Sequence, residues 1–135
     1  FGCCGAAPRA KSAPAQGDPE LLFDDHWGEH ATFFVLRGRG LVVMTSCGHA
    51  GVINSVLRAR SVSGVEKVHA VMGGFHLSPA KPGYIAQVVE ALRDIDPDYI
   101  VPMHCSGAGF IHLAAREMPE KLVLSYVGSQ FHFHP

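Results

Sequence analysis

Three apolar runs in this sequence are each followed closely by histidine or cysteine. The segments VVMTSCGH, VMGGFH and IVPMHC bring Cys47, His49, His76, His104 and Cys105 to the ends of these runs. Thiolate sulfur and imidazole nitrogen are common ligands in zinc and iron sites. The three histidines are 27 and 28 residues apart, which is too far for a local helical motif. The pattern predicts a metal site assembled from distant parts of the chain.

Each of these residues also has a simpler interpretation. Free cysteine often behaves as a small buried hydrophobe, which would suffice for Cys47 and Cys105. A single histidine at the end of a strand is commonly a surface residue or a hydrogen-bonded core residue. The recurrence of the pattern after three runs favours metal binding. We expect four other histidines to be structural or surface residues: His69, His112, His132 and His134.

The spacing of apolar residues predicts the elements that would position these side chains. Helical spacing alternates with short apolar runs that are bounded by Gly, Pro or Asp. We expect strands at 32–36, 41–45, 65–72, 99–103 and 122–127, and helices at 51–62, 84–95 and 110–118. The first two strands are separated by Arg-Gly-Arg-Gly, which predicts a hairpin.

Strands that alternate with helices after the hairpin indicate an α/β fold with helical crossovers. Functional residues in such sheets gather beyond the carboxyl ends of the strands. Right-handed crossovers would place the three strand ends side by side. We therefore expect the cysteine and histidine side chains to converge at one edge of the sheet.

The composition is that of one globular domain. The chain has 135 residues, 47% of them hydrophobic and 17% charged, with a formal charge of −1. This balance gives no general attraction to nucleic acid or to an anionic membrane, so we expect a small-molecule substrate. No membrane span or signal peptide is visible, which favours the cytoplasm. Residues 1–20 read as a flexible arm and 21–135 as the folded unit.

Several motifs give this sequence a family resemblance. RGRGLVVMTSCGHAGVINSV, VHAVMGGFHLSPA, PDYIVPMHCSG and VGSQFHF occur in this order. Together they resemble the carboxy-terminal half of metallo-β-lactamase-fold hydrolases. The most similar branch is that of dihydropterin-ribofuranosyl-aminobenzene-phosphate synthase. The resemblance covers residues 21–133, which is nearly the whole of the predicted folded unit.

The resemblance implies a particular fold. In this superfamily two αββα halves pack as a four-layer sandwich, so one half is a mixed sheet with helices on one face. The other face of an isolated half would be apolar and larger than monomers usually expose. We therefore expect that two copies could pair through this face as a twofold homodimer.

The resemblance also implies roles for individual residues. His49 and His104 match metal-ligand positions, and Cys47 stands where many relatives place a metal-bridging Asp. His76 could be a ligand, a contact for a substrate phosphate or a proton donor, and it is the candidate catalytic residue. The implied cofactor is zinc, or iron or manganese, with one or two ions in a complete site.

One motif of the family is absent. The H-x-H-x-D-H motif of the first half does not occur in the 135 residues, and the nearest segment, DDHWGEH at 24–30, has a different spacing. The first residue is Phe, so we expect a partial chain of a metal-dependent hydrolase, whose activity depends on the missing half. Two alternatives stay open. One is a non-catalytic α/β module for small-molecule binding or dimerisation, and the other is a plain metal-binding protein.

Overall fold

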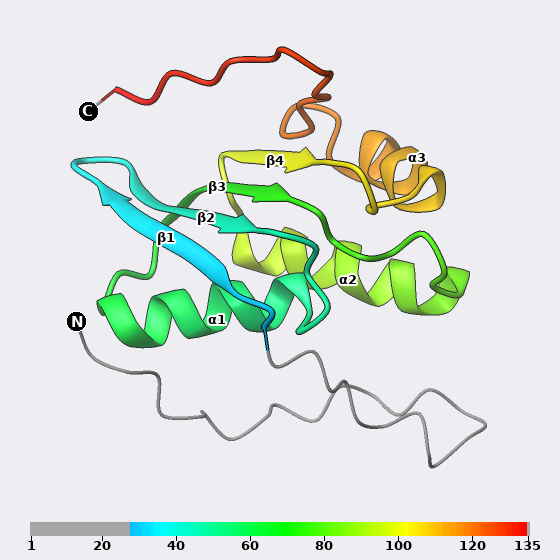
Figure 1. Cartoon of the computed structure of the whole chain (residues 1–135), viewed down its shortest axis with the longest axis horizontal. Coiled ribbons are helices and arrows are strands. Elements are labelled where there is room, and N and C mark those ends of the chain that lie inside the picture. Colours follow the sequence, from blue (N-terminus) through cyan, green and yellow to red (C-terminus); the bar gives the residue numbers. More distant parts are fainter. Residues whose placement is uncertain (1–27, 135) are drawn as a thin grey trace.

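The computed structural model describes residues 28–134, so the predicted arm over residues 1–20 lies outside the described residues. Within these residues the chain folds into one mixed sheet with three helices (Figure 1). Its elements are β1 (Ala31–Leu36), β2 (Gly40–Thr45), α1 (Val52–Ser63), β3 (Val68–Gly73), α2 (Pro82–Ile95), β4 (Tyr99–Pro102) and α3 (Ala108–Glu117).

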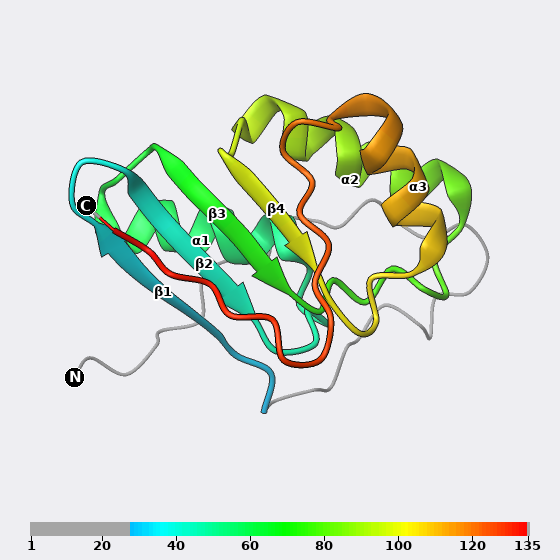
Figure 2. The ribbon, with the colours of Figure 1, turned by 90° about the horizontal axis from the view of Figure 1, so that it is seen from above.

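The strands lie in the sheet in the order in which they occur in the chain. β1 and β2 form the predicted antiparallel hairpin, whereas β2, β3 and β4 are parallel. The predicted α/β class and mixed sheet are therefore confirmed. Because parallel strands point the same way, the carboxyl ends of β2, β3 and β4 lie at one edge of the sheet (Figure 2).

The two faces of the sheet have different partners. Leu41 and Val43 pack with the helices in the larger core, whereas Val42, between them, faces the other side, as the pleat requires. In Figure 1 the helices α1 and α2 lie below the sheet and the C-terminal segment crosses above it. The expectation of helices on one face is confirmed. The second face is partly covered, because Phe131 and Phe133 of that segment pack against it.

The predicted strand at 122–127 is wrong. Only Leu122 forms a bridge, to Ile100 of β4. Ile100 donates its N–H to the carbonyl of Lys121 at 2.8 Å and accepts the N–H of Val123 at 2.9 Å. The next ladder bond would need an N–H from Pro102, which proline lacks, so the pairing stops after one bridge.

The other element boundaries shift by a few residues. β3 begins at Val68, three residues after the predicted start, and α2 begins at Pro82, where proline suits the first turn of a helix. Among residues 28–134 we find no helix with the length and apolarity that a membrane span requires.

Candidate metal centre

The loops that follow β2, β3 and β4 are tied together at the sheet edge. Gly74 donates its N–H to the carbonyl of Ser46 at 3.3 Å, and its own carbonyl accepts the hydroxyl of Thr45 at 2.8 Å. Met103 donates its N–H to the carbonyl of Gly73 at 2.8 Å. These bonds join the three strand ends and hold the side chains after them in place.

Two glycines let these loops approach each other closely. Gly48 has a φ of 78°, and a Cβ there would lie 2.4 Å from the carbonyl oxygen of Gly74. A Cβ on Gly74 would lie 2.6 Å from Cε1 of His104 and 2.8 Å from Sγ of Cys105. All three distances are shorter than the contacts that real Cβ atoms make, so glycine is needed at these two positions for the side chains to gather.

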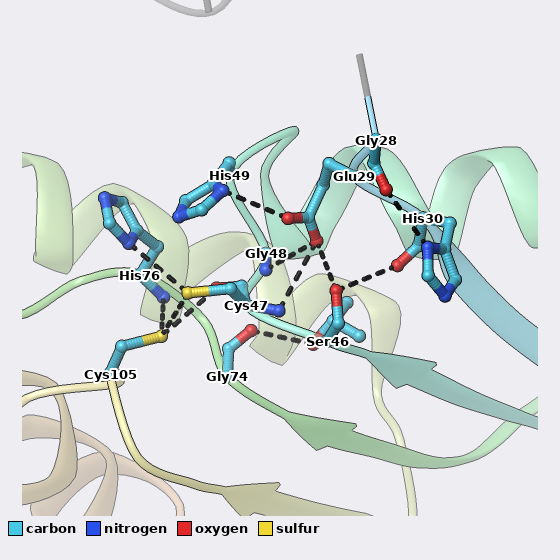
Figure 3. Close-up of polar contacts among 11 residues, drawn as sticks. Gly28, Glu29, His30, Ser46, Cys47, Gly48, His49, Gly74, His76 and Cys105 are labelled. Carbon is cyan, nitrogen blue, oxygen red and sulfur yellow. Dashed lines mark hydrogen bonds and ion pairs between the residues drawn. The ribbon is translucent and has the colours of Figure 1, made fainter. Parts of the chain in front are cut away.

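Cys47 lies at the centre of the group (Figure 3). Its Sγ is 3.3 Å from Sγ of Cys105 and 3.7 Å from Nδ1 of His76, and neither cysteine is in a disulfide. The Cys105 thiol donates to the carbonyl of Cys47 at 3.2 Å and accepts the N–H of His76 at 3.2 Å. The ends of three strands therefore meet at two sulfur atoms.

The possible ligand atoms form two overlapping clusters. Cys47, His49 and His76 make one, and Cys47, His104 and Cys105 make the other, with all ligand atoms of each cluster within 4.8 Å of one another. Cys47 is the shared member. The four residues singled out from the sequence, Cys47, His49, His76 and His104, thus reach the same edge, but His49 and His104 belong to different clusters.

Glu29 organises the loop that carries Cys47 and His49. Its Oε1 accepts the N–H of Gly48 at 3.0 Å, the N–H of Cys47 at 3.4 Å and the hydroxyl of Ser46 at 2.9 Å. Its Oε2 lies 3.0 Å from Nδ1 of His49. This contact sets the orientation of the His49 ring, as carboxylates do beside metal-binding histidines.

The electrostatics of the site are set by these contacts. Burial disfavours the charged form of Glu29, but its hydrogen bonds and the nearby His49 outweigh this and lower its pKa. The hydrogen bond with Cys105, together with burial and neighbouring negative charge, raises the pKa of Cys47 to about 11. Without a cation the Cys47 thiol is protonated at neutral pH, so metal binding there would release a proton.

Sequence reasoning missed Glu29, and it named Cys105 at a strand end without assigning it as a metal ligand. Glu29 lies in the DDHWGEH segment, which was compared only with the H-x-H-x-D-H motif and has a different spacing. The hairpin carried a usable signal: Ala31 pairs with Thr45, so Glu29, two residues before, falls beside Cys47, two residues after. Cys105 was interpreted as a candidate buried hydrophobe, but its sulfur faces Cys47.

Four other histidines, which were expected to be structural or surface residues, lie apart from this group. His69 is buried in β3, and its Nδ1 is 2.6 Å from Oδ2 of Asp98, which fits the expected structural role. The other three are exposed and lie in α3 or the C-terminal segment: His112, His132 and His134.

A cleft of about 330 Å³ opens beside His49 and His76. Apolar side chains from the loops and from α1 and α2 form much of its wall. Asn54, Tyr84 and Gln87 add neutral polar groups to the lining. A cleft of this size next to the imidazoles can hold a small molecule.

Some known proteins are similar to this chain in sequence. No family model matches the chain. The 7,8-dihydropterin-6-methyl-4-(β-D-ribofuranosyl)-aminobenzene-5′-phosphate synthase of Methanocaldococcus jannaschii is 29% identical over 99 residues, which are 73% of this chain and 34% of that protein. An uncharacterized protein of the same organism is 31% identical over 96 residues, or 71% of this chain and 34% of that protein.

A solved structure supports the same relationship. A metal-dependent hydrolase of the β-lactamase superfamily superposes with a TM-score of 0.72 and 28% sequence identity, over 78% of this chain and 40% of the other. The chain thus spans about a third of the length of the curated relatives that it matches. In sequence and in fold, this chain is similar to a half of the metallo-β-lactamase superfamily hydrolases, in the branch of the dihydropterin-ribofuranosyl-aminobenzene-phosphate synthase.

Proposed function

We propose that this chain supplies part of the active site of a metal-dependent hydrolase that acts on a small molecule. The observation that carries the proposal is the meeting of Cys47, His49, His76 and His104 at one sheet edge, in clusters with metal-ligand spacing. The superposed structure is described as a metal-dependent hydrolase. The cleft beside His49 and His76 would receive the substrate.

The side chains present fit a transition metal. His49, His104 and Cys47 would be the ligands, and imidazole with thiolate suits zinc or iron better than manganese, which prefers oxygen. One or two ions would be held in the complete site. The metal would lower the pKa of a bound water and polarise the bond to be cleaved. Glu29 would keep His49 in the ligating orientation.

His76 would act on the cleft side of the site. Its side chain is exposed, lines the cleft and meets the ring of His49 edge to face, with centroids 4.2 Å apart. It can serve as a further ligand or as a proton donor to the leaving group. His76→Gln separates the two roles: a ligand would reduce the metal content, whereas a proton donor would reduce turnover alone.

Metal content is the direct test of the hydrolase proposal. The purified chain is loaded with zinc, iron(II) or manganese(II) in turn, desalted and measured by elemental analysis. We expect bound zinc or iron, with loss in His49→Ala and in His104→Ala but not in the matched surface variant His112→Ala. Loaded protein is then assayed with a panel of chromogenic carboxylate and phosphate esters, with and without chelator. Equal metal content in all three histidine variants would contradict the proposal.

A metal-binding protein without turnover is the second candidate, and the absence of H-x-H-x-D-H in this sequence favours it. Bound metal without chelator-sensitive hydrolysis of any ester would support it. A chain that binds no metal would instead fit a non-catalytic module. We also propose a cytoplasmic location, because reducing conditions there keep thiols such as Cys47 and Cys105 available.

A further inference from the structure

Cys47 and Cys105 are free thiols whose sulfur atoms are in contact, 3.3 Å apart. We propose that they are a redox-active pair, which a low-molecular-weight disulfide such as oxidised glutathione converts into an intramolecular disulfide, and that this bond removes the Cys47 thiolate from the candidate metal centre. Only the second part rests on the proposed function, because the bond itself can form in a chain that holds no metal.

The two sulfur atoms need to move little in order to bond. The sulfurs of a disulfide are about 2.05 Å apart, so the contact at 3.3 Å leaves roughly 1.2 Å to close. The Cys105 thiol donates to the carbonyl of Cys47 at 3.2 Å, so its side chain already points at the other cysteine. Figure 3 shows the two sulfur atoms facing each other from different loops. A small rotation of either side chain closes the gap.

The sheet holds the two cysteines together although they are 58 positions apart in the chain. Gly74 donates its N–H to the carbonyl of Ser46, and Met103 donates its N–H to the carbonyl of Gly73. These bonds fix the strand ends from which the cysteines extend. The thiols therefore meet at a high effective concentration, which favours a bond between them over a lasting bond from either one to a separate molecule.

The surroundings of the pair suit thiol–disulfide exchange. Both side chains are half-buried, so a small oxidant can reach them from solvent. His76 donates its backbone N–H to the Cys105 sulfur at 3.2 Å, and such a bond stabilises the negative charge that a sulfur carries when it attacks or leaves. A disulfide that forms and is reduced in turn is the kind found in reducing compartments.

The exchange takes two steps. One cysteine loses its proton, and its sulfur attacks oxidised glutathione, which forms a mixed disulfide and releases one glutathione thiolate. The other cysteine then loses its proton and attacks the protein sulfur of the mixed disulfide. This closes the bond between Cys47 and Cys105 and releases the second glutathione thiolate. Each released thiolate takes up one proton, so the protein loses two electrons and two protons and one oxidised glutathione becomes two reduced molecules.

The disulfide changes the set of metal ligands. A cysteine binds metal as its thiolate, and a sulfur in a disulfide has no thiolate to offer. Cys47 belongs to both clusters of possible ligand atoms, so one bond removes a ligand from each. The oxidised chain keeps only the imidazoles of His49, His76 and His104 there. It therefore binds zinc more weakly, and bound zinc in turn protects the thiols from oxidation.

A count of thiols tests the pair. The chain has four cysteines, so Cys3→Ser and Cys4→Ser are introduced first, which leaves Cys47 and Cys105 as the only thiols. The metal-free protein is incubated with oxidised glutathione, quenched with an alkylating reagent and weighed by mass spectrometry. We expect both thiols to be lost, with a mass lower by two hydrogen atoms and no bound glutathione. Cys47→Ser and Cys105→Ser in this background should each hold one glutathione instead.

The same protein in urea separates the effect of the fold from the mere presence of two thiols. We expect the mixed disulfide to close at least about tenfold faster in the folded chain, because the fold holds the sulfurs in contact. Far-ultraviolet circular dichroism checks the fold of each protein. Thiols that stay reduced, two glutathiones bound to the folded chain, or closure no faster than in urea would overturn the proposal.

Zinc content tests the second part. The reduced and the oxidised protein are loaded with zinc, desalted and measured by elemental analysis. We expect at least about a twofold fall in bound zinc on oxidation, with recovery after reduction by a phosphine. Unchanged zinc in the fully oxidised chain would overturn this part. A reduced chain that binds no zinc would contradict the hydrolase proposal and this part with it, whereas the thiol count would still decide the first part.

Discussion

Glu29 shows how one carboxylate can set the geometry of a whole loop. It contacts two backbone N–H groups, a hydroxyl and the imidazole of His49. Both oxygen atoms of the carboxylate, and its charge, take part in these contacts, so a neutral amide cannot replace it fully.

Glu29→Gln should weaken metal binding by about 10- to 100-fold, the range seen when the partner of a ligating histidine is removed. The amide carries no charge to oppose the charge of the bound ion, and it presents one acceptor oxygen where the carboxylate has two. Competition with a chromogenic chelator would measure the affinity. Glu90→Gln, on the exposed side of α2, is the matched control and should bind as the parent does. Equal affinities for the two variants would contradict this role for Glu29.

Gly74→Ala should disturb both the fold and the site. The new methyl group would meet Cε1 of His104 and Sγ of Cys105 at less than 3 Å, so one of these side chains must move. We expect a loss of about 1–3 kcal/mol in the free energy of unfolding, typical of overpacking, together with weaker metal binding. Urea denaturation and metal titration would measure the two effects.

Gly83→Ala is the control for this substitution. No atom lies within 4 Å of a Cβ at Gly83, which is in the first turn of α2. Replacing glycine in a helix reduces the entropy of the unfolded chain, so a gain of about 0.4–1 kcal/mol is expected. A loss of stability in Gly83→Ala similar to that in Gly74→Ala would show that the crowding at His104 and Cys105 is not the cause.

At the scale of elements, an ion-pair group joins β3 to the segment before β4. Asp98 accepts from His69 at 2.6 Å and from Lys67 at 3.1 Å. Burial acts to raise the pKa of Asp98, but the hydrogen bonds and charges of His69 and Lys67 outweigh it and lower this pKa. The group lies at the amino end of β3, away from the candidate metal centre.

The lowered pKa of Asp98 gives a pH dependence with a definite sign. Since the pKa is lower in the folded state, the carboxylate stabilises the fold above its unfolded pKa of about 4, and this contribution is lost as the pH falls through the folded pKa. Asp98→Asn should therefore cost about 1 kcal/mol at neutral pH and little in acid. Asp94→Asn, an exposed control, should not show this trend. The free energies of unfolding of the parent and of Asp98→Asn would be measured by chemical denaturation at several pH values. A difference between the two proteins that does not change with pH would contradict this interpretation.

At the scale of the whole molecule, the C-terminal segment lies over the sheet face opposite the helices (Figure 2). Phe133 packs edge to face with Phe34 of β1 at 5.9 Å and with His69 at 6.0 Å between ring centroids. The segment also covers a cluster of buried apolar residues: Val42, Ala70, Met72 and Val101. Pairing of two copies through this face stays a prediction, and the segment would compete with it.

Weakening the segment should favour self-association. The double variant Phe131→Ser with Phe133→Ser removes the aromatic cover and exposes apolar surface, which drives association. Light scattering at micromolar concentration should show a higher mass than for the parent. His132→Ser with His134→Ser changes exposed residues in the same segment and serves as the control. If all three proteins have the same mass, the covered face does not mediate pairing.

Much of the fold follows from local patterns in the sequence. The apolar period predicted the hairpin, the three helices and the parallel strands, because burial on one face leaves a repeat of two or 3.6 residues. The predicted strand at 122–127 was wrong for a non-local reason. Its ladder ends where Pro102, on a neighbouring strand, has no N–H to donate, and the sequence of 122–127 carries no sign of this.

The sequence by itself determined that Cys47, His49, His76 and His104 follow strands, and hence that they reach one edge of a parallel sheet. Only the tertiary structure decided how they group. Cys47 is shared by two clusters, Cys105 faces it, and Glu29 reaches the loop from across the hairpin. Such contacts depend on distances of a few ångströms between segments far apart in the chain, which spacing along a sequence does not specify.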